Sequence, residues 1–219
     1  LPSMDVKMMF FATFVQAMWK RGSIEAMGTF AMVFVGCGSV ALERSPLEIS
    51  LAFGAIVALV IIVIGRWSGA HINPAVSIAF YYRGDLSSQD TVAHVIGQLF
   101  GGLLAGFALA GAGPTVRNTS WINLIGIEIF ITFALMASIL LIIRKTDRWI
   151  PIAIVVGSSV AVLAFLFGAY TGASMNPART FGPNLISGDG ALIPVYFVST
   201  TIGALLAVQV ERIIQTVSE

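Results

Sequence analysis

Six apolar runs, each long enough to cross a bilayer, constrain this chain more than any other feature of its sequence. A helix needs about 20 mostly apolar residues to cross the hydrocarbon layer of a membrane. Apolar residues make up 57% of the 219 residues and charged residues only 11%, whereas a soluble domain carries about 25% charged residues. The sequence therefore predicts an all-α membrane protein with six transmembrane helices, at 22–41, 47–66, 88–112, 121–143, 150–170 and 191–212.

The rest of the composition excludes several classes of function. The net charge is +1, and no Lys/Arg tract with interleaved aromatic residues occurs, so nucleic-acid binding is not supported. Cys37 is the one cysteine of the chain, and the two histidines form no metal-ligand cluster in the sequence. We therefore expect no metal and no cofactor.

Two segments between the spans are predicted to re-enter the membrane without crossing it. Residues 67–87 and 171–190 are too long for tight turns, and they are too short and too interrupted for full spans. Each carries a proline near its start, and proline is favoured at the first position of a helix. We expect only the second half of each segment to be helical.

Lysine and arginine collect on one side of the predicted topology. Cytoplasmic loops carry an excess of these residues. Arg44 and Arg117 lie on one side, and the side that holds both termini has Lys7, Lys20, Arg21, Arg66, Arg83, Arg144, Lys145, Arg148 and Arg212. Both termini are therefore predicted to be cytoplasmic. Residues 1–21 are predicted to be a cytoplasmic or interfacial segment, in which 4–19 form an interfacial helix ahead of the first span, with a partly ordered tail as the alternative.

The chain contains an internal repeat with a spacing of 103 residues. The tripeptide Asn-Pro-Ala occurs at that spacing as Asn73-Pro74-Ala75 and Asn176-Pro177-Ala178. Glu25 and Glu128, the acidic residues deep inside apolar runs, have the same spacing. The repeat divides one integrated membrane domain into 22–112, with the loop 67–87, and 113–219, with the loop 171–190. Because three spans per repeat is an odd number, the second repeat is inverted relative to the first, and the two re-entrant loops meet near the midplane.

Each Asn-Pro-Ala is predicted to start a short helix. Asparagine is a favoured N-cap, and proline fits the first helical position. Two such helix starts that meet aim their positive dipole ends, each worth about half an elementary charge, at one point, which disfavours cations. The Asn73 and Asn176 amides can donate to an oxygen in transit. The carbonyls that can accept from it are those of Gly69, Ala70, His71, Gly172, Ala173 and Ser174.

Three charged residues fall inside the predicted membrane core. A carboxylate there is costly and usually has a partner, so Glu25 and Glu128 are assigned as acceptors for backbone N–H groups of the re-entrant loops. A proton relay is the alternative for the pair. Arg179 lies three residues after Asn176, where it can put a fixed positive charge into a narrow passage. The alternative for Arg179 is a side chain that snorkels to the surface.

Together, the six spans, the inverted repeat, SGAHINPAV and TGASMNPARTFGP resemble the aquaporin, or major intrinsic protein, superfamily. The resemblance covers residues 22–214 and implies one pore per subunit, usually in a homotetramer. Half-helix dipoles and an arginine are the selectivity elements described for such pores. Carried over by spacing, the narrow filter consists of Phe53, Ala164, Ala173 and Arg179. Water-selective members of the family typically have histidine at the position of Ala164.

The filter residues and their neighbours match neither the water-selective nor the glycerol-type pattern completely. The loss of an imidazole at Ala164 widens the filter, whereas Thr180 and Asn184 argue against a glycerol-type pore. We therefore expect a passive channel for water, with permeability to small neutral solutes and exclusion of ions and protons. One alternative is an aquaglyceroporin- or metalloid-type solute facilitator. A second, from a different class, is a secondary transporter. A junctional protein without conduction and an intramembrane enzyme rank below these, and we expect no enzymatic activity.

Overall fold

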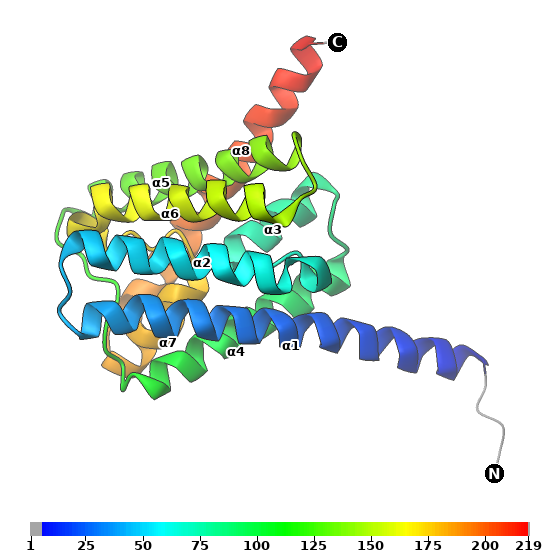
Figure 1. Ribbon diagram of the computed structural model, residues 1–219, viewed down its shortest axis with the longest axis horizontal. Coiled ribbons are helices and arrows are strands. Elements are labelled where there is room, and N and C mark those ends of the chain that lie inside the picture. The colour runs from blue at the N-terminus through cyan, green and yellow to red at the C-terminus, as the bar shows by residue number, and fades with distance from the viewer. Residues whose placement is uncertain (1–5, 219) are drawn as a thin grey trace.

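The computed structural model describes residues 6–218, and within them the chain is helical throughout with irregular connections (Figure 1). The elements, in chain order, are α1 (Val6–Ala41), α2 (Pro46–Ser68), α3 (Pro74–Arg83), α4 (Ser88–Ala108), α5 (Trp121–Ile143), α6 (Trp149–Thr171), α7 (Pro177–Ser187), the short 3-10 helix η1 (Gly190–Leu192) and α8 (Ile193–Ser218).

Six of these helices are long and apolar enough to cross a membrane, as predicted. The helix at 121–143 has the predicted bounds, and most other bounds differ by a few residues. The span predicted at 191–212 ends later, because α8 continues to Ser218, and the span predicted at 88–112 ends earlier, because α4 ends at Ala108. Beyond it the chain turns through residues with positive φ, namely Ala110, Gly111 and Gly113, and this backbone conformation cannot continue a right-handed helix.

The N-terminal segment differs from its prediction. It is helical from Val6, but it is not a helix separate from the first span, because α1 continues without interruption to Ala41. The part long and apolar enough to span begins at Met18, and the N-terminal half of α1 projects beyond the bundle (Figure 1). Nothing in the local sequence stops the helix: Gly22 alone is tolerated in a helix interior, and no proline is present there. Residues 1–5 of the predicted segment lie outside the described part of the chain.

The two sequence repeats have the same pattern of helix–helix contacts. The pairs α1–α4 and α1–α2 of the first repeat correspond to α5–α8 and α5–α6 of the second, and α2 packs against its own counterpart α6. Gly54 and Gly157, which are 103 residues apart, face each other at that crossing. A Cβ atom on Gly54 would lie 2.5 Å from the Gly157 carbonyl oxygen, and one on Gly157 would lie 2.6 Å from that of Gly54. The inverted repeat therefore has its close central contact at this pair of glycines.

The half-helices are the two short helices of the fold, α3 and α7. Asn73 and Asn176 cap them with extended backbone, and a proline occupies the first turn of each. Glycines in the left-handed conformation, Gly84 and Gly188, follow their last residues, which is the usual way for a helix to end. Each half-helix packs against the last long helix of the other repeat, α3 on α8 and α7 on α4.

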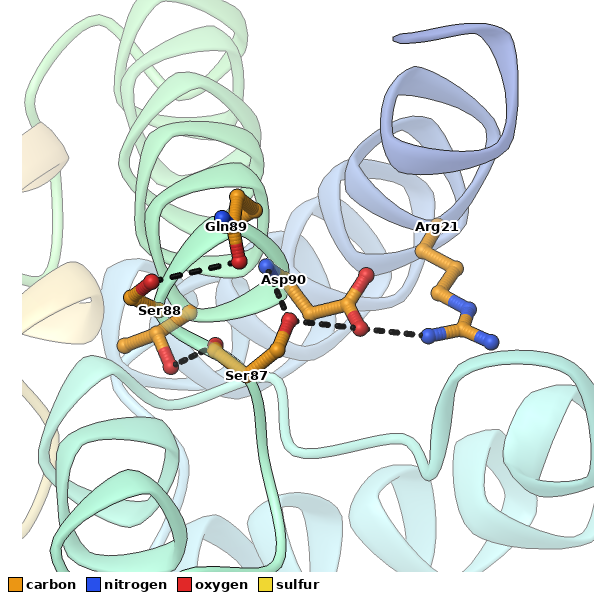
Figure 2. Close-up of polar contacts among 6 residues, drawn as sticks. Arg21, Ser87, Ser88, Gln89 and Asp90 are labelled. Carbon is orange, nitrogen blue, oxygen red and sulfur yellow. Dashed lines mark hydrogen bonds and ion pairs between the residues drawn. The ribbon is translucent and has the colours of Figure 1, made fainter. Parts of the chain in front are cut away.

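An ion pair joins α1 to the start of α4, near the point where α1 leaves the bundle. Arg21 Nη1 lies 2.6 Å from Asp90 Oδ2, and Ser87 caps α4 by accepting from the Asp90 backbone N–H (Figure 2). Arg21 is half exposed, so the pair contributes at most about 1 kcal/mol to stability. The pair lies where α1 passes the start of α4, and the packing of the two helices rests on their long mutual contact.

Candidate functional site

The two half-helices meet end to end through their asparagines. Asn73 Oδ1 accepts from the Ala75 N–H at 2.9 Å, and Asn176 Oδ1 accepts from the Ala178 N–H at 2.9 Å. Each side-chain amide also donates to the opposite loop: Asn73 Nδ2 to the Met175 carbonyl and Asn176 Nδ2 to the Ile72 carbonyl, both at 2.8 Å. Each asparagine therefore ties the start of its own half-helix to the backbone of the other loop.

These cross-loop bonds leave one hydrogen of each amide nitrogen for another partner, since a primary amide has two. The second contact of Asn176 Nδ2 is the thioether sulfur of Met32 at 3.6 Å, and a thioether is only a weak acceptor. Both asparagines are nearly buried, yet both line a cavity. Their remaining N–H groups are therefore placed where they can donate to a small molecule in that cavity.

The loops before the half-helices have an unusual backbone. Ala70, Ile72, Ala173 and Met175 have φ values between 41° and 52°, a region that costs non-glycine residues free energy. The four positions form two pairs at the spacing of 103. Strained backbone of this kind persists only where surrounding contacts hold it, and both buried glutamates supply such contacts.

Glu25 holds the first loop. It is fully buried, and its carboxylate accepts from the backbone N–H groups of His71 at 3.1 Å and Ile72 at 2.6 Å, and from the Ser68 hydroxyl at 2.6 Å. Gln98 Nε2 of α4 donates to the same carboxylate at 2.7 Å. The lone pairs of the carboxylate are thus engaged by donors of the loop and of a neighbouring helix.

Glu128 holds the second loop in the same manner. It accepts from the backbone N–H groups of Ser174 and Met175, each at 2.9 Å, and from the Thr171 hydroxyl at 2.7 Å. These donors match those of Glu25 at the spacing of 103 residues. Both glutamates are fully enclosed and lie behind the loops, because neither lines the cavity.

A cavity of about 400 Å³ runs along the bundle past the junction of the half-helices. It is lined by both asparagines, by all four predicted filter residues, and by all the predicted carbonyl residues except Gly172. Pro74, Ala75, Pro177 and Ala178 do not line it and form the buried starts of the half-helices. Towards the cytoplasmic end expected from the basic residues, the lining includes Thr146, Asp147 and Trp149.

Arg179 lies on the opposite side of the asparagines from that end and is held on two sides. Its Nη1 donates to the Gly113 carbonyl at 3.1 Å, and its guanidinium carbon lies 5.2 Å from the centre of the Phe53 ring. Its side chain is nearly buried, and Nε has no hydrogen-bond partner among the described residues. The structure therefore puts a buried cation, with donors to spare, against the aromatic ring that lines the same cavity.

Sequence reasoning missed the support for Arg179. The loop that carries Gly113 is fastened to α7, because Thr115 N donates to Asn184 Oδ1 and Asn184 Nδ2 donates to the Thr115 carbonyl, each at 2.9 Å. Gly113 has φ 72°, and a Cβ there would lie 2.4 Å from the Cys37 carbonyl oxygen. The one sequence signal was the glycine-rich stretch AGAGP, which marks a turn but names no partner.

The two histidines pack together beside the first loop. His71 Nδ1 lies 3.1 Å from Ser77 Oγ, its ring stacks on Phe80, and its edge faces His94. His71 lines the cavity, whereas His94 is fully buried, and neither His94 nitrogen has a partner within the described part of the chain. His71 therefore packs among rings beside the loop, and His94 lies behind it, away from the cavity.

Six long apolar helices around two opposed half-helices and an internal cavity define a multi-pass integral membrane protein. Residues 13–210 match the major intrinsic protein family. The chain therefore belongs to this family of aquaporin channels.

Relatives support the assignment. Aquaporin-4 of Mus musculus is 34% identical over 224 residues, which cover 93% of this chain and 69% of the relative. A probable aquaporin NIP-type of Nicotiana alata is 33% identical over 210 residues, covering 88% and 76%. The X-ray structure of the aquaglyceroporin from Plasmodium falciparum superposes with a TM-score of 0.81 at 23% identity, covering 87% of this chain and 94% of that one. This last likeness is one of fold.

Proposed function

We propose that the protein is a passive channel that conducts water and small neutral solutes and excludes ions and protons. The observation that carries the proposal is the junction of the two half-helices, where Asn73 and Asn176 cap opposed helix starts and line one cavity. Two helix N-termini that point at the same place favour electronegative atoms and disfavour cations. Arg179 adds a full positive charge further along the cavity.

Water orientation at the junction supports proton exclusion. A water molecule beside the asparagines accepts from their free N–H groups, and it can donate only to acceptors away from that point. The carbonyls of the two left-handed loops supply such acceptors on either side. A hydrogen-bonded wire that would carry protons is therefore interrupted where the half-helices meet, as in the general account of half-helix pores.

The size of the filter residues supports permeation by solutes larger than water. Ala164 and Ala173 contribute only methyl groups to the cavity lining, which also includes the larger Phe53 and Arg179. The same observation favours an aquaglyceroporin- or metalloid-type facilitator as the second candidate. A secondary transporter is the candidate from another class, since inverted repeats also form carriers. The buried glutamates argue against that candidate, because loop donors already engage their oxygens.

We further propose that both termini are cytoplasmic and that the protein forms a homotetramer in the bilayer. The orientation is supported by the clustering of Lys and Arg at the end that carries both termini. The homotetramer is proposed from the family alone.

Uptake by proteoliposomes distinguishes these candidates. With a gradient of glycerol or urea, a channel of the proposed width gives an uptake rate that rises linearly with concentration and does not depend on Na⁺ or proton gradients. A carrier would instead saturate and respond to the gradients. Vesicles that contain the protein but take up neither solute faster than empty vesicles would contradict the proposed solute range, and saturable coupled uptake would contradict a channel.

A further inference from the structure

Gly36 of α1 packs directly against Phe53 of the predicted filter. This contact is possible because glycine has no side chain. A Cβ atom built on Gly36 would lie 2.1 Å from Phe53 Cε1, 2.3 Å from Cδ1 and 2.5 Å from Cζ. Such separations do not occur between real non-bonded carbon atoms. The Phe53 ring therefore occupies the space that any other residue at position 36 would fill.

The groups on either side of the ring are held in place. The Arg179 guanidinium lies 5.2 Å from the ring centre and is held by the Gly113 carbonyl. The backbone N–H of Arg179 contacts Asn176 Oδ1 at 3.4 Å, so the residue starts from a capped helix turn. On the α1 side, the Ser39 hydroxyl donates to the Gly36 carbonyl at 2.6 Å. The α1 backbone lies on one side of the Phe53 ring and the held Arg179 guanidinium on the other. If a side chain is added at position 36, the ring is therefore the group that must move.

The repeat shows that this position can carry a large side chain elsewhere in the fold. At the spacing of 103 residues, Gly36 corresponds to Ile139 and Phe53 corresponds to Val156, and both counterparts line the cavity. In the second repeat, two side chains of intermediate size, one from α5 and one from α6, thus line the cavity at these positions. In the first repeat, α1 has no side chain at position 36, and α2 contributes the aromatic ring of Phe53.

We propose that Gly36 is a specificity-determining residue, because it lets the Phe53 ring sit back against α1 and so keeps the filter wide enough for solutes larger than water. The inference rests on the proposed function, in which Phe53 and Arg179 border the filter. A methyl group at position 36 displaces the ring away from α1 and into the cavity that the ring lines. The passage then narrows without any change to the four filter residues.

The test compares Gly36→Ala with Gly38→Ala. Both substitutions replace a glycine by alanine in the same helix, which favours helix formation equally. A Cβ at Gly38 would meet only Leu109 Cδ2 at 3.6 Å, an ordinary contact. In proteoliposomes we expect Gly36→Ala to lower the ratio of glycerol to water permeability about tenfold, the scale of one methyl group in a fitted site. Gly38→Ala should keep the ratio of the unmodified protein.

A second variant separates the filter effect from a folding effect. Adding Phe53→Leu to Gly36→Ala shortens the displaced side chain, so the ratio should return to or exceed that of the unmodified protein. An unchanged ratio in Gly36→Ala, or an equal loss of water and glycerol flux that Phe53→Leu does not restore, would overturn the inference while leaving the proposed function intact. An unmodified protein that conducts neither water nor glycerol would overturn both.

Discussion

Replacing Glu128 with alanine is expected to abolish water conduction and to lower the thermal stability of the protein sharply. The substitution leaves three donors without their acceptor: the backbone N–H groups of Ser174 and Met175 and the hydroxyl of Thr171. Each orphaned buried donor costs about 1–3 kcal/mol, and a folded domain is stable by only about 5–15 kcal/mol. The left-handed backbone of the second loop, which these bonds hold, should relax and close the passage.

Two further variants make this expectation specific. Glu128→Gln keeps one oxygen as an acceptor, but its amide nitrogen would face an N–H donor, so we expect conduction between that of Glu128→Ala and that of the unmodified protein. Ser138→Ala, in the same helix, removes a hydroxyl whose hydrogen-bond partner among residues 6–218 is the Leu135 carbonyl of its own helix, and it should conduct normally. Stopped-flow light scattering and a thermal unfolding scan measure both effects. Normal conduction by Glu128→Ala would show that the glutamate does not support the loop.

Replacing Ala164 with histidine should reduce glycerol and urea uptake strongly while water flux is largely retained. Ala164 lines the cavity together with Phe53 and Arg179, so an imidazole there takes up space that a solute needs and adds a hydrogen-bond donor that water can use. We expect at least about a tenfold fall in the ratio of solute to water permeability, because a single methylene in a fitted site already discriminates by about that factor and an imidazole ring is larger.

Ala164→Leu is the matched control, because leucine fills space without adding a polar group. It should lower the flux of water and solutes together, whereas histidine should discriminate between them. Both variants are measured in one vesicle preparation, with the protein content of the vesicles determined by immunoblot. Unchanged glycerol and urea uptake by Ala164→His would count against a filter widened at this position.

Much of this fold could be predicted because membrane-spanning helices are recognised in a sequence by their length and their apolar composition. The span at 121–143 has the observed bounds, and the two Asn-Pro-Ala copies predicted where α3 and α7 begin. The predicted start of the first span at residue 22 was wrong, because the local sequence contains no residue that ends or interrupts a helix. Lys20, Arg21 and Gly22 look like the end of a loop, yet α1 continues through them, since nothing there breaks the backbone hydrogen bonds.

The site was only partly predictable, because its main contacts join residues that are distant in the chain. The repeat spacing located Glu25 and Glu128 behind the loops, and the structure shows their bonds to loop N–H groups. The donation of each asparagine to the opposite loop could not be predicted, since it depends on how two inverted halves meet. The same applies to the Gly113 carbonyl under Arg179 and to Gly36 beside Phe53, where a missing side chain matters only through its neighbour.

Water and proton flux, measured side by side in the same proteoliposomes, test the central claim most directly. Osmotic shrinkage gives the water permeability, and a pH-sensitive dye inside the vesicles reports proton entry under an imposed pH gradient. The account predicts a water permeability several times that of empty vesicles, with proton entry no faster than in empty vesicles. Water permeability equal to that of empty vesicles, or proton entry that rises together with water flux, would contradict it.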